Sequence, residues 1–346
     1  MLHSNELQGT KMLYPYKFTP ALVERVWGGT ALSRYGKSIP FGKRIGESWE
    51  ISDRDDVQSV IANGPDKGKT LREQITAHGA QLLGTNCGKP TRFPLLIKLL
   101  DARERLSLQV HPPASVAAKL KGEPKTEMWC VLEAEQDAHL IAGFRRGVTG
   151  ADFMRAMEGF KNHDGQEKTI EDYVYRFPVL TGDTFFVPSG RIHAIDAGVV
   201  LVEIQQSSDT TYRVYDWGRT GLDGKPRKLH ASESLACIDF QDYEPKKQRA
   251  AVEYHGVNGL WRLVECPYFH VHRLELRNAW PDRCDGSTFH ILSCTKGAVG
   301  LLTPDGKEER INVGEFVLLP ATLGFYTLTP LTENTQALKS YVPRSV

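Results

Sequence analysis

Four residues of this sequence have side chains of the types that bind divalent metal ions. Gln109 and His111 lie two residues apart in a segment with strand-like alternation, so their side chains point to one face of a sheet. Glu127 opens a second apolar strand, and His193 follows a G-x5-P segment that begins at Gly182. Two imidazoles, a carboxylate and an amide oxygen suit Zn²⁺, and they also fit Fe²⁺, Mn²⁺ or Co²⁺. The pattern indicates a metal site inside a β-barrel.

A structural role for these histidines is the alternative interpretation. A histidine in a strand is often held by local hydrogen bonds and performs no chemistry. The metal interpretation depends on the pairing of Q-V-H-P at residues 109–112 with G-x5-P-x-G-x-x-H at residues 182–193, which would place the second histidine at a barrel rim. Spacing alone leaves both interpretations open.

Two further groups could contact a ligand. A hydroxyl-rich loop, residues 205–212, leads into a strand that carries Arg213, which is an arrangement able to hold a sugar or a phosphate. Lys125 precedes Glu127 by two residues, so it would share that strand face and could transfer protons. The alternatives are a polar surface loop with a salt-bridged arginine and a solvated basic face around Lys125.

The elements that must position these residues are mostly short strands. Strand signals fall at residues 93–100, 106–110, 127–133, 139–143, 185–188, 199–205 and 213–217. Helices are predicted over 70–83, where Thr70 and Glu73 form a capping box, and over 149–157 and 166–175. Strands without regular strand–helix alternation favour a sandwich or barrel, and no GxGxxG or Walker motif is present.

The second part of the chain repeats one motif of the first. A charged stretch at residues 243–249 predicts a linker, and G-x5-P recurs at residues 314–320 without a following histidine in register. We therefore expect two related β-barrels. The first, residues 1–250, would hold the metal, and the second, residues 251–346, would be a β domain without metal ligands.

Composition limits the possible partners. The 346 residues carry 43 Lys and Arg against 42 Asp and Glu, so no broad positive field would attract nucleic acid or membranes. The six cysteines are widely spaced and form no CxxC pair, which is typical of reduced thiols. The chain shows no signal-peptide pattern and no apolar run long enough to span a bilayer. We expect a cytoplasmic protein without nucleic-acid or membrane partners.

Six segments of the chain closely resemble the type I mannose-6-phosphate isomerases (phosphomannose isomerases) in their short bacterial form. The resemblance runs in order from about residue 12 to 240, and the part that follows matches only as a degenerate second cupin-like domain. The segments are WGG at 27–29, GESWE at 46–50, LQVHP at 108–112, KTEMW at 125–129, PSGRIHAI at 188–195 and SSDTTYRVYDWGR at 207–219.

The resemblance implies a mainly β, cupin-type jelly-roll fold with a few helices. It implies a monomer or weak dimer with one Zn²⁺ per chain that interconverts mannose 6-phosphate and fructose 6-phosphate through an enediolate. In this family's pattern the metal ligands fall on Gln109, His111, Glu127 and His193, the catalytic arginine on Arg213, the active-site lysine on Lys125 and a substrate-facing carboxylate on Glu203. The phosphate is assigned to Ser107, with Lys98 or Lys119.

Two other functions stay open at this point. An iron-dependent cupin dioxygenase would bind Fe²⁺ and consume oxygen, although its first motif usually supplies two histidines where this chain has Gln109 and His111. A non-catalytic cupin would bind a sugar phosphate without turning it over. Elemental analysis and an activity assay distinguish these functions from an isomerase.

Overall fold

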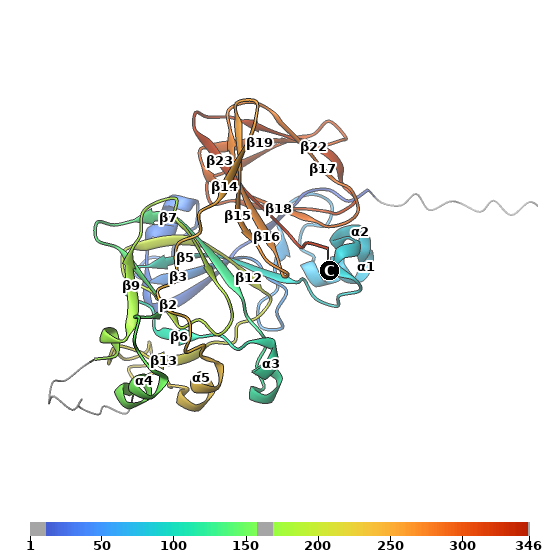
Figure 1. The fold of residues 1–346 in the computed structure, drawn as a ribbon. Coiled ribbons are helices and arrows are strands. Elements are labelled where there is room, and N and C mark those ends of the chain that lie inside the picture. The colour runs from blue at the N-terminus through green and yellow to red at the C-terminus, as the bar shows by residue number, and fades with distance from the viewer. Residues whose placement is uncertain (1–11, 158–168, 345–346) are drawn as a thin grey trace, which may run out of the picture.

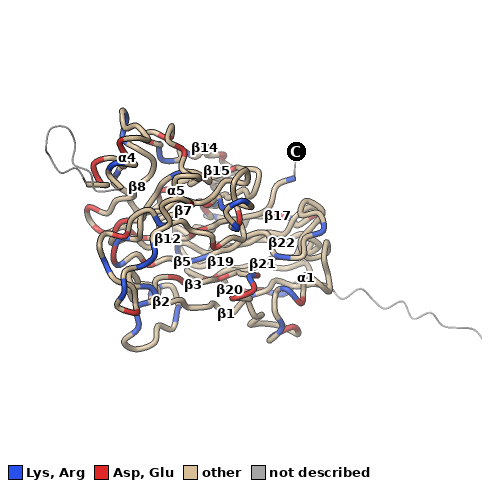
Figure 2. Tube along the Cα trace, turned by 90° about the horizontal axis from the view of Figure 1, so that it is seen from below, with Lys and Arg blue, Asp and Glu red and all other residues tan. Residues whose placement is uncertain are grey.

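The computed structural model describes residues 12–157 and 169–344. These residues form four antiparallel sheets, which confirms the expected mainly β class, and two layered β units are visible, one blue to yellow and one orange to red (Figure 1). Acidic and basic residues are interspersed along the trace, in keeping with the near-zero net charge (Figure 2). None of the helices in the described part of the chain has the length and apolar character needed to cross a membrane.

The first barrel pairs a six-stranded sheet, in the order β10-β7-β12-β5-β3-β2, with a five-stranded sheet, in the order β13-β6-β11-β8-β9. Trp27, Trp129 and Phe185 are among the apolar side chains that fill the space between them. The strands are β2 (Ala21–Gly29), β3 (Ile45–Ile51), β5 (Leu95–Ala102), β6 (Leu108–Val110), β7 (Glu127–Ala134), β8 (His139–Phe144), β9 (Val174–Pro178), β10 (Thr184–Val187), β11 (His193–Ile195), β12 (Val199–Gln206) and β13 (Tyr212–Tyr215).

The second barrel pairs an eight-stranded sheet, in the order β14-β15-β16-β23-β18-β21-β1-β4, with a four-stranded sheet, in the order β17-β22-β19-β20. Strands β1 and β4 come from the N-terminal part of the chain, so the second barrel includes strands from both sides of residue 250. The domain boundary at residue 250 stays a prediction. The strands are β1 (Tyr16–Thr19), β4 (Val60–Ile61), β14 (Ala251–His255), β15 (Asn258–Glu265), β16 (His270–Leu276), β17 (Trp280–Cys284), β18 (His290–Lys296), β19 (Ala298–Leu302), β20 (Glu308–Asn312), β21 (Phe316–Leu319), β22 (Gly324–Pro330) and β23 (Thr335–Tyr341).

One apolar core joins the two barrels. Ile97 of β5 and Val202 of β12 contribute from the first barrel, and Ile291 of β18 and Leu318 of β21 contribute from the second. All eight residues of β5 are buried, because one face lines the first barrel and the other packs on this shared core. A strand covered on both faces requires the nearly continuous apolar sequence from which a buried strand was predicted.

The glycine of each G-x5-P segment lies in a turn just before a strand, as predicted. Gly182 and Gly314 have φ values of 91° and 79°, in the region that favours glycine, and β10 and β21 follow them. At Gly314 a Cβ atom would also lie 2.6 Å from the backbone oxygen of Tyr35, so two constraints select glycine there.

The helices differ from the predictions in two places. The capping box of Thr70 and Glu73 is confirmed, but Gly79 interrupts the helix and divides it into α1 (Leu71–His78) and α2 (Ala80–Leu83). The predicted helix at residues 166–175 is wrong after residue 168, where a 3₁₀ turn over Ile170–Asp172 leads into β9; its first part lies outside the described residues. The remaining helices are α3 (Ala114–Ala117), α4 (Gly150–Met157) and α5 (Ala231–Cys237), which lie at one end of the first barrel (Figure 1).

Candidate active site

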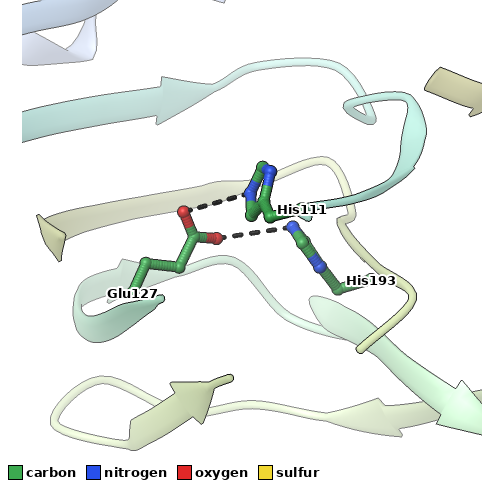
Figure 3. A group of neighbouring side chains, drawn as sticks. All are labelled: His111, Glu127 and His193. Carbon is green, nitrogen blue, oxygen red and sulfur yellow. Dashed lines mark ion pairs between the residues drawn. The ribbon is translucent and has the colours of Figure 1, made fainter. Parts of the chain in front are cut away.

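Three of the predicted metal ligands converge inside the first barrel (Figure 3). His111 directly follows β6, Glu127 is the first residue of β7, and His193 is the first residue of β11. The Nε2 atom of His111 lies 3.3 Å from one oxygen of Glu127, and that of His193 lies 3.4 Å from the other. All three side chains are buried, so strand ends far apart in the sequence bring three donor groups to one point.

Hydrogen bonds on the far side of each imidazole orient the two rings. The Nδ1 atom of His111 lies 3.0 Å from the carbonyl oxygen of Thr210, and that of His193 lies 2.8 Å from the carbonyl oxygen of Arg191. An Nδ1–H that donates to a carbonyl leaves the Nε2 lone pair free, which is how metal-binding histidines are commonly fixed. Both lone pairs are therefore directed toward Glu127.

Several buried polar atoms of this cluster have no hydrogen-bond partner among the described residues. His111 Nε2 and both carboxylate oxygens of Glu127 are buried without a hydrogen-bond partner. The ammonium group of Lys125, 2.8 Å from Glu127, offsets only part of this cost. A divalent cation bound by the two imidazoles and the carboxylate would satisfy all three atoms, so these residues fit a metal ion.

The protonation states also suit metal binding. Burial alone would raise the pKa of Glu127, but the charge of Lys125 holds this pKa well below its ordinary value. Burial and the neighbouring His111 lower the pKa of His193 to about 3, and burial with the charge of Lys125 lowers the pKa of His111. An ionised carboxylate and neutral imidazoles are the forms that bind metals.

Gln109 lies beside this cluster. It pairs with His193 of β11 on one side and with Arg213 of β13 on the other. Its amide nitrogen lies 3.3 Å from His193 Nε2, and a rotated amide would offer the oxygen at that point instead. Gln109 is therefore placed to be the fourth ligand.

A cavity of about 540 Å³ opens next to these ligands. Of the residues predicted to contact substrate, Lys119 is exposed on a 3₁₀ helix and is not among the lining residues. The lining includes the other predicted residues, namely Lys98, Ser107, Gln109, Lys125, Glu203 and Arg213, and several that were not predicted, among them Arg25, Glu47, Asp209 and Arg227.

Lys98 lies at the centre of a buried charge cluster in this cavity. Its ammonium is 3.5 Å from Glu47 and 3.6 Å from both Glu203 and Asp209. Burial favours the neutral amine, but the three carboxylates raise the pKa of Lys98 above its ordinary value. Burial and the charge of Glu127 raise the pKa of Glu203 to about 7, and its carboxylate accepts a 3.0 Å hydrogen bond from Trp129.

Arg213 points its guanidinium at the cavity from β13. One terminal nitrogen donates to the carbonyl oxygen of Lys228 at 2.8 Å, while Nε is buried without a partner among the described residues. Burial lowers the pKa of Arg213, and the nearby Arg227 adds to the effect. A guanidinium held in this way at the cavity wall can bind an anionic oxygen.

Sequence reasoning missed Glu47 and Arg25, which form an ion pair at 2.9 Å on the cavity wall. The signal for Glu47 was present, because a glutamate inside the short GESWE strand segment must be either exposed or compensated. Arg25 gave no such signal, since β2 reads as an ordinary mixed strand. Only the pairing of β2 with β3 brings the two side chains together.

The pH dependence of the free energy of unfolding tests the contribution of this ion pair to stability. Burial opposes ionisation of Glu47, yet Lys98 and Arg25 lower its pKa from 4.5 to about 2. The ionised form therefore stabilises the fold above pH 4.5, and this contribution is lost as the pH falls toward 2. We expect Glu47→Gln to lower the free energy of unfolding at neutral pH by at most about 3 kcal/mol, with the difference from wild type narrowing below pH 4.5. Urea unfolding of metal-free protein measures this, and a difference independent of pH would contradict it.

Comparison with known proteins places the chain in a family. The profile of "Phosphomannose isomerase type I, catalytic domain" matches residues 16–129. Mannose-6-phosphate isomerase ManA of Bacillus subtilis is 35% identical over 323 residues, which cover 92% of this chain and 97% of the relative. This chain belongs to the type I phosphomannose isomerases.

Another relative and two solved structures are also similar to this chain. The mannose-6-phosphate isomerase of Streptococcus mutans is 33% identical, covering 90% of this chain and 94% of the relative. The crystal structure of the B. subtilis enzyme superposes with a TM-score of 0.83 at 31% identity, covering 95% of this chain and 99% of the other. A putative mannosephosphate isomerase from Archaeoglobus fulgidus shares the fold, with a TM-score of 0.75 at 19% identity and coverage of 96% and 99%.

These comparisons confirm three expectations. The chain is an enzyme of the phosphomannose isomerase family, its fold is of the cupin type found in that family, and the family assignment from the six motifs is correct. The similarity also extends beyond the expected limit near residue 240, because the alignment with the B. subtilis enzyme covers 92% of the chain.

Proposed function

We propose that this enzyme interconverts mannose 6-phosphate and fructose 6-phosphate at a Zn²⁺ ion, one per chain, held by Gln109, His111, Glu127 and His193. The observation that carries the proposal is the buried set of unsatisfied donor atoms beside a cavity lined with charged groups. Relatives that bear the name mannose-6-phosphate isomerase support the substrate assignment. When bound, a zinc ion would act as a Lewis acid that polarises the sugar carbonyl or hydroxyl oxygens.

The reaction moves a proton between C2 and C1 of the open-chain sugar, through an enediolate that spans both carbons. Arg213, which lines the cavity, stabilises the negative oxygen of this intermediate with its guanidinium group. Lys125 and Glu203 both line the cavity with titratable groups, and the proton transfer is assigned to one of these two. The cavity holds the chain of the sugar between them.

The phosphate is assigned to Ser107 and Lys98, which both line the cavity. The exposed position of Lys119, away from the cavity lining, favours Lys98 as the partner of Ser107. Arg25 and Arg227 line the same cavity and add positive charge. The cytoplasmic location and the monomeric or weakly dimeric state stay predictions of the sequence.

A coupled assay of mannose 6-phosphate conversion, before and after chelation, tests the proposal. We expect chelation to remove the metal and the activity together, and Zn²⁺ to restore both. Mannose, run alongside, should react far more slowly because it lacks the phosphate. Full activity in protein from which the metal has been removed would contradict the metal-dependent mechanism.

The same preparation tests the two other functions. Bound iron with oxygen uptake would indicate a dioxygenase, and saturable binding of mannose 6-phosphate without conversion would indicate a non-catalytic protein. No observation in the described residues favours either function over isomerisation.

A further inference from the structure

A second group of metal-binding side chains lies in the second barrel. Glu265 is the last residue of β15, and His270 and His272 lie two residues apart in the neighbouring β16. One potential ligand atom from each residue lies within 4.8 Å of the others. None of these residues lines the cavity of the proposed active site.

Both histidines point to the inner face of the second barrel. His270 and His272 lie on the same face of β16 as Leu274 and Leu276, which belong to the apolar core of that barrel. Val271, on the opposite face, packs in the core shared with the first barrel. The two imidazoles therefore line one end of the second barrel, where the β15–β16 hairpin turns.

A β-bulge brings the carboxylate to the same face. Arg262 pairs with His272, but the register then shifts, so that Val264 pairs with Val271 and Glu265 pairs with His270. Without the extra residue, Val264 would lie opposite His270 and no carboxylate would meet the histidines. Bulges commonly redirect a side chain in this way near a binding site.

We infer that Glu265, His270 and His272 bind a divalent transition-metal ion of the zinc class. A Glu265 oxygen lies 3.1 Å from His272 Nε2 and 3.9 Å from His270 Nδ1, so small side-chain rotations would bring the three atoms around one ion. Two imidazoles and one carboxylate are a common ligand set for such ions and leave positions for water. His272 is buried, whereas the side chains of His270 and Glu265 are 25% and 39% exposed, so an ion can enter from solvent.

The polar groups nearest these three residues are partly engaged with one another. The Tyr341 hydroxyl, 3.4 Å from His270 Nδ1, would have to release that nitrogen to a bound ion. Lys339, which lies opposite His272 in the neighbouring strand β23, pairs with Asp282 at 2.6 Å, and His290 lies 2.8 Å from the hydroxyl of Tyr326. The cation that competes for Glu265 is Arg262, 3.3 Å away and itself 46% exposed, so water screens this ion pair strongly.

This inference replaces the expectation that residues 251–346 lack metal ligands. That expectation followed the repeated G-x5-P motif, after which no histidine stands in register. The cluster instead uses β15 and β16, which come before the motif in the chain. The sequence contains an H-x-H pair at residues 270–272. Only the β-bulge in β15 places the carboxylate of Glu265 on the same face as this pair.

Zinc titration of the full chain after chelation tests the inference, with bound metal counted by elemental analysis after dialysis. We expect two ions per wild-type chain, one ion in the double variant His270→Ala/His272→Ala, and unchanged isomerase activity in that variant. Glu265→Gln, at a partly exposed position where unfolding is not expected, should weaken the second site at least tenfold. His255→Ala is the matched control, because His255 forms an exposed pair with Glu253 in the same barrel and should keep two ions.

The outcomes separate this inference from the proposed function. The double variant His111→Ala/His193→Ala should also hold one ion, at the second site, and lose activity. A wild-type chain that binds a single ion, or a second ion bound equally well by Glu265→Gln and by His270→Ala/His272→Ala, would overturn the inference. Neither result would affect the assignment of the first site.

Discussion

Replacing His111 with alanine is expected to remove one bound metal ion per chain and to abolish isomerase activity at the same time. His111 presents a buried Nε2 atom that is free because Thr210 accepts the Nδ1 proton, and its loss would leave Glu127 with one imidazole fewer. Removing even a group that only orients a metal ligand typically costs roughly 10- to 100-fold in affinity or activity, so we expect a loss of more than about 100-fold. His193→Ala should behave in the same way.

The matched control for this prediction is His139→Ala. His139 begins β8 in the same barrel, but its ring contacts the carbonyl oxygen of Asp137 in an exposed position, so both metal content and activity should stay at wild-type levels. Elemental analysis and the coupled assay measure the two quantities on one preparation. A His111→Ala protein that has lost the ion but stays active would contradict the proposed role of this site.

Replacing Arg213 with alanine is expected to separate activity from metal content. Arg213 lies opposite Gln109 in the sheet and faces the cavity, but it donates to no metal ligand, so the ion should stay bound. Loss of one donor that stabilises a negative oxygen in the transition state typically lowers kcat by roughly 100- to 1000-fold, and we expect an effect of that size. Steady-state kinetics on metal-saturated protein measures it.

Two variants make the result interpretable. Arg213→Lys keeps the charge but loses the planar donor group, so it should recover only part of kcat. Arg103→Ala removes an exposed arginine that pairs with Glu135 on the surface and should change nothing. If Arg213→Ala raised KM while kcat stayed at the wild-type value, Arg213 would hold the substrate and would not stabilise the enediolate.

Much of the fold followed from local sequence signals. The apolar segment before Leu100, the capping box at Thr70 and the two G-x5-P segments each lie in the predicted element, because burial, capping and positive φ act over a few residues. Two features were not predicted, one of them local and the other a contact between distant segments. Gly79 breaks a helix that the apolar spacing would continue, and β1 pairs with β21, which lies some three hundred positions along the chain.

The metal ligands were similarly accessible from the sequence. A carboxylate, two imidazoles and an amide in apolar strands are costly unless they bind something, so their residue types made Gln109, His111, Glu127 and His193 candidates, and the resemblance to the family favoured the metal interpretation over a structural one. The other charged residues that line the cavity could not be predicted from the sequence. Lys98 meets Glu47 and Asp209 only because β3 pairs with β5 and the loop after β12 folds over them.

The sequence by itself determined the family and the mainly β class, and it predicted the donor groups of the proposed first site, because motif identity and strand alternation are local properties of the chain. The tertiary structure alone decided which charges surround the substrate cavity. It also decided that Glu265 lies opposite His270, because a single bulged residue in β15 changes the face on which that carboxylate lies. Strand register depends on pairing between strands, and residue spacing within one strand does not specify it.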